Sequence, residues 1–111
     1  WAVVHAATGT ISTSDLRRKE AIARLEPGLD FLRDLVPVSY RFKDGSRTHF
    51  GLIAQQVKGA MDKNGVEDFA GWTLADSADP NSEQGLRYEQ FVPILIKAVQ
   101  ELASKLEAAT P

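Results

Sequence analysis

Residues 89–106, EQFVPILIKAVQELASKL, form the clearest helical pattern in the sequence and set the expected fold class. Apolar residues recur along this stretch at spacings of three and four, as they do on an amphipathic helix. Pro93 fits such a helix only within its first turn, where backbone N–H groups have no helical acceptor. Two adjacent stripes are apolar, the first being Phe91, Leu95, Ala98, Leu102 and Leu106 and the second being Val92, Ile96, Val99 and Ala103.

A helix with two apolar faces has to bury both of them. One face can pack on its own domain while the other packs on copies of itself, as in a coiled coil. A wide core-facing stripe in a monomer is the alternative, and the pattern alone favours neither.

The rest of the chain predicts short elements of both kinds. Val38, Tyr40 and Phe42 alternate with polar residues as along a strand, and a turn at 43–46 leads to a partner strand at 48–50. The sequence therefore predicts a small, mostly helical α+β domain with short antiparallel strands and a long C-terminal helix. The other expected elements are two short strands within 1–13 that turn at Gly9, helices at 15–25, 29–35 and 52–57 with Met61 extending the last, and strands at 66–72 and 86–88 around a polar loop at 76–82.

Composition narrows the classes of function. The chain has 111 residues and a net charge of −2, so we expect one modest core and no strong attraction to nucleic acid or anionic membranes. It has no cysteine, which excludes disulfides, thiolate catalysis and cysteine-based metal sites. No apolar run approaches the ~20 residues that span a bilayer. His5 and His49 are not at metal-ligand spacing, and neither a phosphate-binding glycine loop nor a G-x-S-x-G motif occurs.

One run remains that can carry chemistry, SDLRRK at residues 14–19. A serine hydroxyl needs a base to become a nucleophile, and a neutral lysine amine can be that base. Five residues along a regular helix turn about 500°, which places Ser14 and Lys19 ~140° apart. The two side chains meet only if Ser14 lies outside the helix as its cap and Lys19 folds back. An ordinary helix capped by Ser14 explains the same residues.

Four segments in order resemble the peptidase S74, or intramolecular chaperone, family. They are SDLRRKEAI at 14–22, PVSYRFK at 37–43, HFGLIAQQV at 49–57, and Tyr88 followed by LIKAVQEL at 95–102. The similarity extends over residues 14–106. The family occurs at the C-termini of phage tailspikes and tail fibres and in bacterial surface fibres.

The resemblance implies a homotrimer, with the C-terminal helix in a trimeric helical bundle or coiled coil. Members guide the preceding β-rich stalk into a trimer and then cleave themselves. Residues 1–13 are then the end of the stalk, which leaves with the fibre, and residues 14–111 are the chaperone domain. The start on Trp1 rather than Met also suggests that residues 1–13 are the end of a longer chain. The resemblance implies a precursor of a virion tail fibre or bacterial surface fibre, assembled and cleaved in the host cytoplasm, with no cofactor, metal, nucleic acid or membrane as partner.

The resemblance also implies the reaction and its residues. Ser14 is the nucleophile, Lys19 is the general base, and the scissile bond joins Thr13 to Ser14. Asp15 is expected to hold the scissile turn, and Arg17 to orient the site or bind a carboxylate.

Three further residues match the family's second motif. His49 is expected near the site or near a subunit contact, or else as a strand histidine satisfied in the core. Gly51 is expected to permit a sharp turn from strand to helix. Gln55 is expected to cap or bridge a buried polar group.

Two other functions are compatible with the sequence. The first is a structural module that trimerises a fibre without cleavage. The second is a receptor-binding or glycan-binding tip, with Trp1, Trp72 or Tyr88 as stacking residues. The Ser14 and Lys19 pair argues against the first, and the small number and wide scatter of the aromatics argue against the second.

Overall fold

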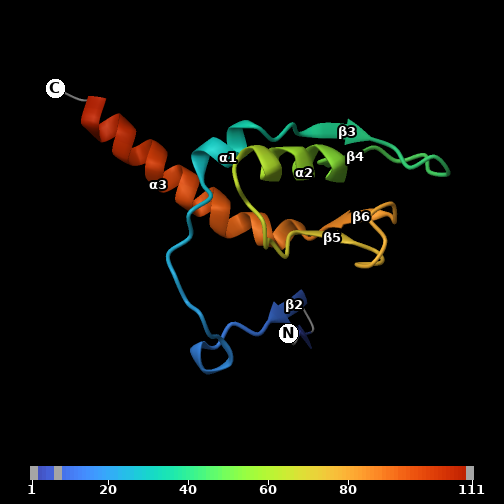
Figure 1. Cartoon of the computed structure of the whole chain (residues 1–111), viewed down its shortest axis with the longest axis horizontal. Helices are drawn as coiled ribbons and strands as arrows, with labels where there is room; N and C mark the ends of the chain where they lie inside the picture. Colours follow the sequence, from blue (N-terminus) through green and yellow to red (C-terminus); the bar gives the residue numbers. More distant parts are fainter. Residues whose placement is uncertain (1–2, 7–8, 110–111) are drawn as a thin grey trace.

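Figure 1 shows the computed structural model of the chain, which describes residues 3–6 and 9–109, with side chains from residue 11 onward. Short antiparallel strand pairs and helices confirm the predicted α+β class. The elements in order are β1 (Val3–Ala6), β2 (Gly9–Ser12), the 3-10 turn η1 (Leu16–Arg18), α1 (Leu29–Arg33), β3 (Val38–Tyr40), β4 (His49–Gly51), α2 (Ala54–Lys63), β5 (Trp72–Leu74), β6 (Gln84–Leu86), the 3-10 turn η2 (Tyr88–Gln90) and α3 (Phe91–Ala109).

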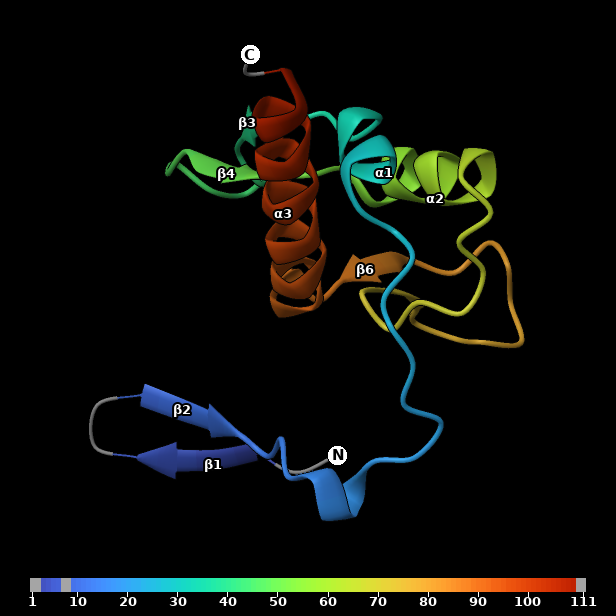
Figure 2. The same ribbon diagram turned by 90° about the vertical axis from the view of Figure 1, so that its left-hand side faces the viewer.

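The molecule has a compact part and an outlying arm. We call residues 29–109 the body, and residues 3–6 and 9–28 the arm. Figure 2 shows β1, β2 and η1 well away from the helices, joined to α1 by a segment without regular structure that we call the linker (residues 20–28). The molecule measures 54 × 35 × 34 Å, and in Figure 1 its longest axis runs from the end of α3 to the loop that joins β3 and β4, with the arm to one side.

The core lies in the body, between α1, α2 and the beginning of α3. Phe31, Val57, Met61 and Ile94 are its fully buried large side chains. Ala60 and Met61 follow Val57 by three and four residues along α2, so the three side chains lie on one face of the helix, and this face is buried. Phe69 joins the helices by edge-to-face ring contacts with Phe31 at 6.2 Å and with Phe91 at 5.2 Å.

The face of α3 that is buried in this chain is narrower than the combined width of the two apolar stripes identified in the sequence. Its buried residues are Phe91, Ile94 and Ala98, and Ile94 belongs to neither predicted stripe. Within the described part of the chain, α1, a helix of five residues, and the end of the linker pack along α3, and they leave most of its apolar surface exposed. Figure 1 shows the C-terminal end of α3 extending beyond α1 and the other elements of the body. The exposed large apolar residues of α3 are Val92, Leu95, Ile96, Val99, Leu102 and Leu106.

The predicted hairpin in the middle of the chain is confirmed. β3 and β4 are antiparallel, with Val38 opposite Gly51 and Tyr40 opposite His49. The predicted strands at 66–72 and 86–88 also pair, but as β5 and β6, displaced to 72–74 and 84–86. The helix predicted at 52–57 begins at residue 54 and includes Met61.

Two strands also form within residues 1–13, as predicted, and they are antiparallel. Gly9, which was expected in the turn, is the first residue of β2. Residues 1–2 and 7–8 lie outside the described part of the chain, as do the parts of the prediction that fall on them.

The helix predicted at 15–25 is wrong. Only the single 3-10 turn η1 forms, and its cap is Asp15 rather than Ser14. Lys19 is already extended, with φ −118° and ψ 145°, and Ala21 adopts a positive φ of 54°. A short helix depends on packing of an apolar face. The apolar side chains of this segment, which are Leu16, Ile22 and Leu25, remain exposed.

Candidate functional site

Ser14 and Lys19 meet in the arm. Lys19 Nζ donates a hydrogen bond to Ser14 Oγ at 2.6 Å, and both residues are exposed. The contact is possible because the segment is not an α-helix. One 3-10 turn spans Leu16–Arg18, and the extended backbone of Lys19 then lets its side chain reach back over the turn. Thr13, which follows β2, is half-buried directly before the serine.

An ion pair fixes the turn that separates these two residues. The Arg17 guanidinium donates to both carboxylate oxygens of Asp15, from Nε at 3.2 Å and from Nη2 at 2.8 Å. Asp15 Oδ1 also accepts the backbone N–H of Arg17 at 2.9 Å, which caps η1. These hydrogen bonds, the side-chain ones first, hold the pKa of Asp15 below its usual 3.8, and the same pair raises the pKa of Arg17.

Asp15 and Arg17 therefore lie where the sequence predicts, beside Ser14 and Lys19. The carboxylate that Arg17 binds is that of Asp15. Both side chains are largely exposed, at 41% for Asp15 and 87% for Arg17, so their contribution is local order rather than stability of the whole fold.

His49, Gly51 and Gln55 lie elsewhere within this chain. They belong to β4 and the first turn of α2, on the far side of the body from the arm in Figure 1. The His49 ring is exposed and stacks on Tyr40 with centroids 5.5 Å apart, so it is not a core histidine. Gln55 is exposed and its side chain makes no hydrogen bond among the residues that the structure describes, so it neither caps nor bridges a buried group.

Gly51 has a sterically defined role that the sequence did not predict. The hydroxyl of Tyr88 lies 2.5 Å from the position that a Cβ on residue 51 would take. That hydroxyl accepts the backbone N–H of Leu52 at 3.0 Å. Gly51 therefore leaves room for Tyr88 to anchor the strand-to-helix turn. No local pattern signals a contact between residues 36 positions apart.

The aromatics considered for ligand stacking serve contacts within the chain. Trp72 donates its Nε1–H to Gln84 Oε1 at 3.0 Å, and Lys58 Nζ lies 5.2 Å from its ring centroid. Tyr88 is occupied at Leu52. Trp1 lies outside the described residues. These contacts remove support from the glycan-binding alternative.

No helix among residues 9–109 combines the length and the apolar character that crossing a membrane requires. The body and the arm together define a small α+β domain. The body has a long apolar C-terminal helix, and the arm carries a serine and a lysine that are hydrogen-bonded to each other.

Comparison with known families agrees with this class. A family model described as "Peptidase S74: Chaperone of endosialidase" matches residues 14–66, so the chain carries a chaperone-of-endosialidase segment that begins at Ser14. The match confirms the resemblance over this range. No curated protein sequence matches the chain at a significant level.

Proposed function

We propose that this chain is an intramolecular chaperone that trimerises, assists the folding of a phage tail fibre, tailspike or bacterial surface fibre, and then releases itself by cutting Thr13–Ser14. The observation that carries the proposal is the hydrogen bond of 2.6 Å between Lys19 Nζ and Ser14 Oγ, in the segment where the family match begins. The nucleophile and its target carbonyl are covalent neighbours. Proximity of this kind supplies much of a rate enhancement without an elaborate site.

The cleavage can be written with all atoms accounted for. Neutral Lys19 takes the proton of Ser14 Oγ, which forms a bond to the carbonyl carbon of Thr13. The C–N bond between Thr13 and Ser14 then breaks, and the proton moves from Lys19 to the leaving nitrogen, which becomes the free α-amine of Ser14. Water hydrolyses the resulting ester, giving the carboxyl end of Thr13 and restoring the Ser14 hydroxyl.

Lys19 has to change its role in the hydrogen bond for this reaction. Its ammonium form donates to Ser14 Oγ, whereas the base in the first step is the neutral amine, which accepts. The hydrogen bond between Lys19 Nζ and Ser14 Oγ can form with the lysine either charged or neutral, with the direction of donation reversed. Asp15 and Arg17 hold the turn that keeps the two side chains together, which makes them positioning residues.

Assembly is proposed to use the exposed apolar face of α3. Burying a large apolar side chain completely is worth about 1.5–3 kcal/mol. Six such residues on α3 are about half or more exposed in the single chain, with Leu106 the most exposed at 71%. A trimeric bundle of α3 helices would cover this face, and the preceding stalk would be brought together at the same time.

Intact mass spectrometry of the folded protein tests the cut. Wild-type protein should separate into two fragments at Thr13–Ser14, while Ser14→Ala should keep its full mass. Ser12→Ala is the matched control, because Ser12 is an exposed serine two residues before the site and should still allow the cut. A full-length mass that persists in assembled wild-type protein excludes self-cleavage and leaves the non-cleaving trimerisation module.

Hydroxylamine tests the ester step. It attacks esters faster than amides, so it should accelerate release and leave a hydroxamate on Thr13. Release without any hydroxamate at saturating hydroxylamine contradicts the ester route while leaving the position of the cut intact.

Analytical ultracentrifugation tests the assembly. Leu95→Asp places a charge in the exposed apolar face of α3 and should give monomers. Ser104→Asp, on the same helix, is the control for added charge alone. A wild-type protein that sediments as a monomer at all concentrations contradicts the trimer.

A further inference from the structure

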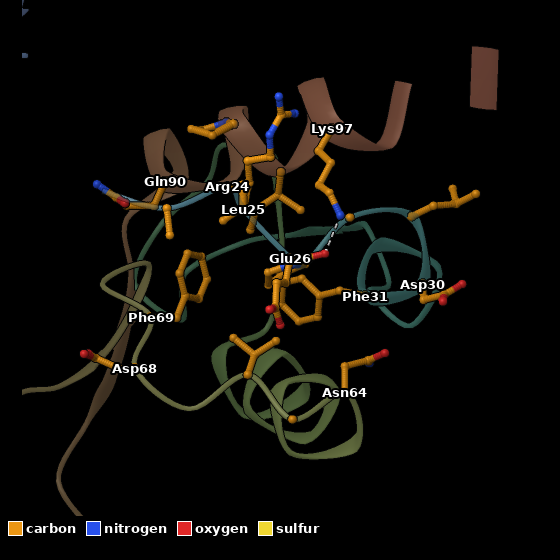
Figure 3. A pocket seen from close by; sticks show the side chains of 18 of the residues that line it. Arg24, Leu25, Glu26, Asp30, Phe31, Asn64, Asp68, Phe69, Gln90 and Lys97 are labelled. Atoms are coloured by element: carbon orange, nitrogen blue, oxygen red, sulfur yellow. Dashed lines mark hydrogen bonds between the residues drawn. The ribbon is translucent and has the colours of Figure 1, made fainter. Parts of the chain in front are cut away.

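The linker is attached to the body through α3. Lys97 Nζ donates a hydrogen bond of 2.6 Å to the backbone carbonyl oxygen of Glu26, and Figure 3 shows the lysine reaching down from the helix to it. Within the described part of the chain, this is the one hydrogen bond that joins residues 20–27 to the body. The attachment therefore depends on one side chain far along the sequence.

The last residue of the linker, Gly28, is held by Lys97 together with a second residue of α3, Glu101. Lys97 and Glu101, one turn apart on α3, form an ion pair of 3.3 Å in which both side chains are about two-thirds buried. The Glu101 carboxylate lies against the position that a Cβ on residue 28 would take, so glycine lets this side chain close over residue 28 and a larger residue would displace it. Gly28 is buried there, and its carbonyl accepts the N–H of Leu32 at the start of α1.

The remainder of the linker is not packed into the core. It forms one wall of an open groove of about 880 Å³ between α3, α1 and residues 64–69. Figure 3 shows Phe31 and Phe69 on the inner side of this groove and Arg24 and Leu25 near α3. Apart from the contacts with Lys97 and Glu101, no hydrogen bond among the described residues ties residues 20–27 to the body.

We infer that Lys97 and Glu101 form a clamp on residues 26–28 that positions the arm, and with it the Ser14–Lys19 segment, relative to α3. This role rests on the proposed self-cleavage. α3 is also the helix whose exposed apolar face is proposed to assemble. The clamp therefore couples assembly to cleavage, because any placement of α3 against neighbouring copies also places the arm. Lys97 and Glu101 act through the linker and are positioning residues.

Spin-label distances test the clamp without reference to cleavage. The chain has no cysteine, so Glu20→Cys and Glu107→Cys supply the only labelling sites, one at the start of the linker and one at the end of α3. The measurement uses the Ser14→Ala background to keep the chain intact and an excess of unlabelled protein to isolate single chains. We expect one narrow distance distribution. Lys97→Met should spread it over roughly 15 Å, as for a free segment of eight residues.

Two further variants separate the clamp from general effects on the helix. Lys97→Arg retains a donor and should keep the distribution narrow. Lys105→Met removes a lysine two turns further along α3 and should have no effect, since the side chain of Lys105 makes no hydrogen bond or ion pair among the described residues. An unchanged distribution in Lys97→Met overturns the clamp.

Cleavage rates with Ser14 present test the coupling. Lys97→Met should slow cleavage of the assembled protein about tenfold or more, because small misplacements of reacting groups cost large factors in rate. Lys97→Arg should restore most of the rate. A released arm with an unchanged rate overturns the positioning role. A wild-type chain that stays uncut removes the proposed function, and the spin-label distances still decide whether the clamp exists.

Discussion

The arm and the body of this molecule use opposite means to hold their shape. In the body, Phe31, Val57, Met61 and Ile94 are almost fully removed from solvent. In the arm, every large apolar side chain described is exposed, from Ile11 and Leu16 to Ile22 and Leu25. The body is held by apolar burial contributed from many parts of the sequence, whereas the arm beyond β2 is held by hydrogen bonds among residues 14–19 and by its attachment to α3.

This difference suggests that the arm and the body have separate roles, the arm in cleavage and the body in assembly. A site that acts once per chain needs a local geometry and access to its own backbone, and residues 14–19 provide both without a core. The body supplies the surface for assembly. A change at residues 14–19 of the arm should therefore alter cleavage with little loss of stability, whereas a change in the buried core of the body should mainly lower stability.

The largest expected effect is on cleavage, from a single change in the arm. Lys19→Ala removes the proposed base and should slow the cut by about 10²–10⁴-fold. Lys19→Arg should not restore the rate, because a guanidinium stays charged and cannot take the proton. The thermal midpoint of the body should remain the same, since Lys19 is exposed. Mass spectrometry over time and a circular dichroism melt measure the two quantities.

Arg18→Ala is the matched control for this prediction. Arg18 is the exposed cation directly before Lys19, and it makes no hydrogen bond with its side chain among the described residues. Its variant should cut at close to the wild-type rate. Cleavage by Lys19→Ala at the same rate as by Arg18→Ala would remove Lys19 from the mechanism.

The largest expected effect on stability comes from the body. Met61 is the most deeply buried large side chain, with no exposed surface. Met61→Ala leaves a cavity among α1, α2 and α3 and should lower the free energy of unfolding by about 2–5 kcal/mol. Urea unfolding of the Ser14→Ala protein measures this without fragmentation. Phe50→Ala is the control, because Phe50 is 87% exposed and its loss should change stability by less than about 0.5 kcal/mol. Equal effects of the two changes contradict the assigned core.

An intermediate effect is expected where Tyr88 meets the β4–α2 turn. Gly51→Ala places a methyl group against the Tyr88 hydroxyl and the Tyr40 ring, and should cost about 1–3 kcal/mol through overpacking. Tyr88→Phe removes the hydroxyl and its hydrogen bond to Leu52 but makes room. In that background Gly51→Ala should cost clearly less. A double-mutant cycle from urea unfolding measures the coupling, and strictly additive effects contradict the contact.

The sequence predicted the elements that carry regular patterns. The alternation through Val38 and Tyr40 gave the central hairpin, and the spacing of Val57 and Met61 gave a helix with the correct buried face. The direction in which α3 packs was not predictable. Its pattern is apolar on several sides, and the choice of Ile94 as a core residue depends on where α1 lies.

The sequence proposed Ser14 and Lys19 as a pair but did not predict the geometry that brings them together, and His49, Gly51 and Gln55 lie elsewhere in the chain. The sequence predicted a helix at 15–25, but a helix of that length is marginal without packing, and Asp15 and Arg17 stabilise a tighter turn instead. This turn and the extended backbone of Lys19 bring the lysine to Ser14, which a regular helix that included both residues would not. The clamp was invisible for another reason: Glu26 and Lys97 are 71 residues apart, and no local pattern connects them.

The smallest expected effect is an acid-dependent loss of stability at α1. Hydrogen bonds from Asn64 first, and then from Lys63, lower the pKa of Asp34 from its usual 3.8. A carboxyl whose pKa is lower in the folded protein contributes stability above its unfolded value. That contribution disappears as the pH falls through the folded pKa. Asp34 should therefore help join α1 to the end of α2 near neutral pH, and this contribution should begin to fall near the usual 3.8 and be lost as the pH passes below the lower folded pKa.

Urea unfolding of Ser14→Ala protein at pH 7 and pH 3, with and without Asp34→Asn, measures this effect. The variant should be less stable than its parent at pH 7 and should lose less stability on acidification, so the gap between the two should be narrower at pH 3. Asp30→Asn, one turn earlier on α1, is the control, since Asp30 makes no hydrogen bond with its side chain among the described residues. A constant gap between Asp34→Asn and its parent at both pH values contradicts the ionic origin of the contact. It would leave packing at the α1–α2 junction as the reason for the loss.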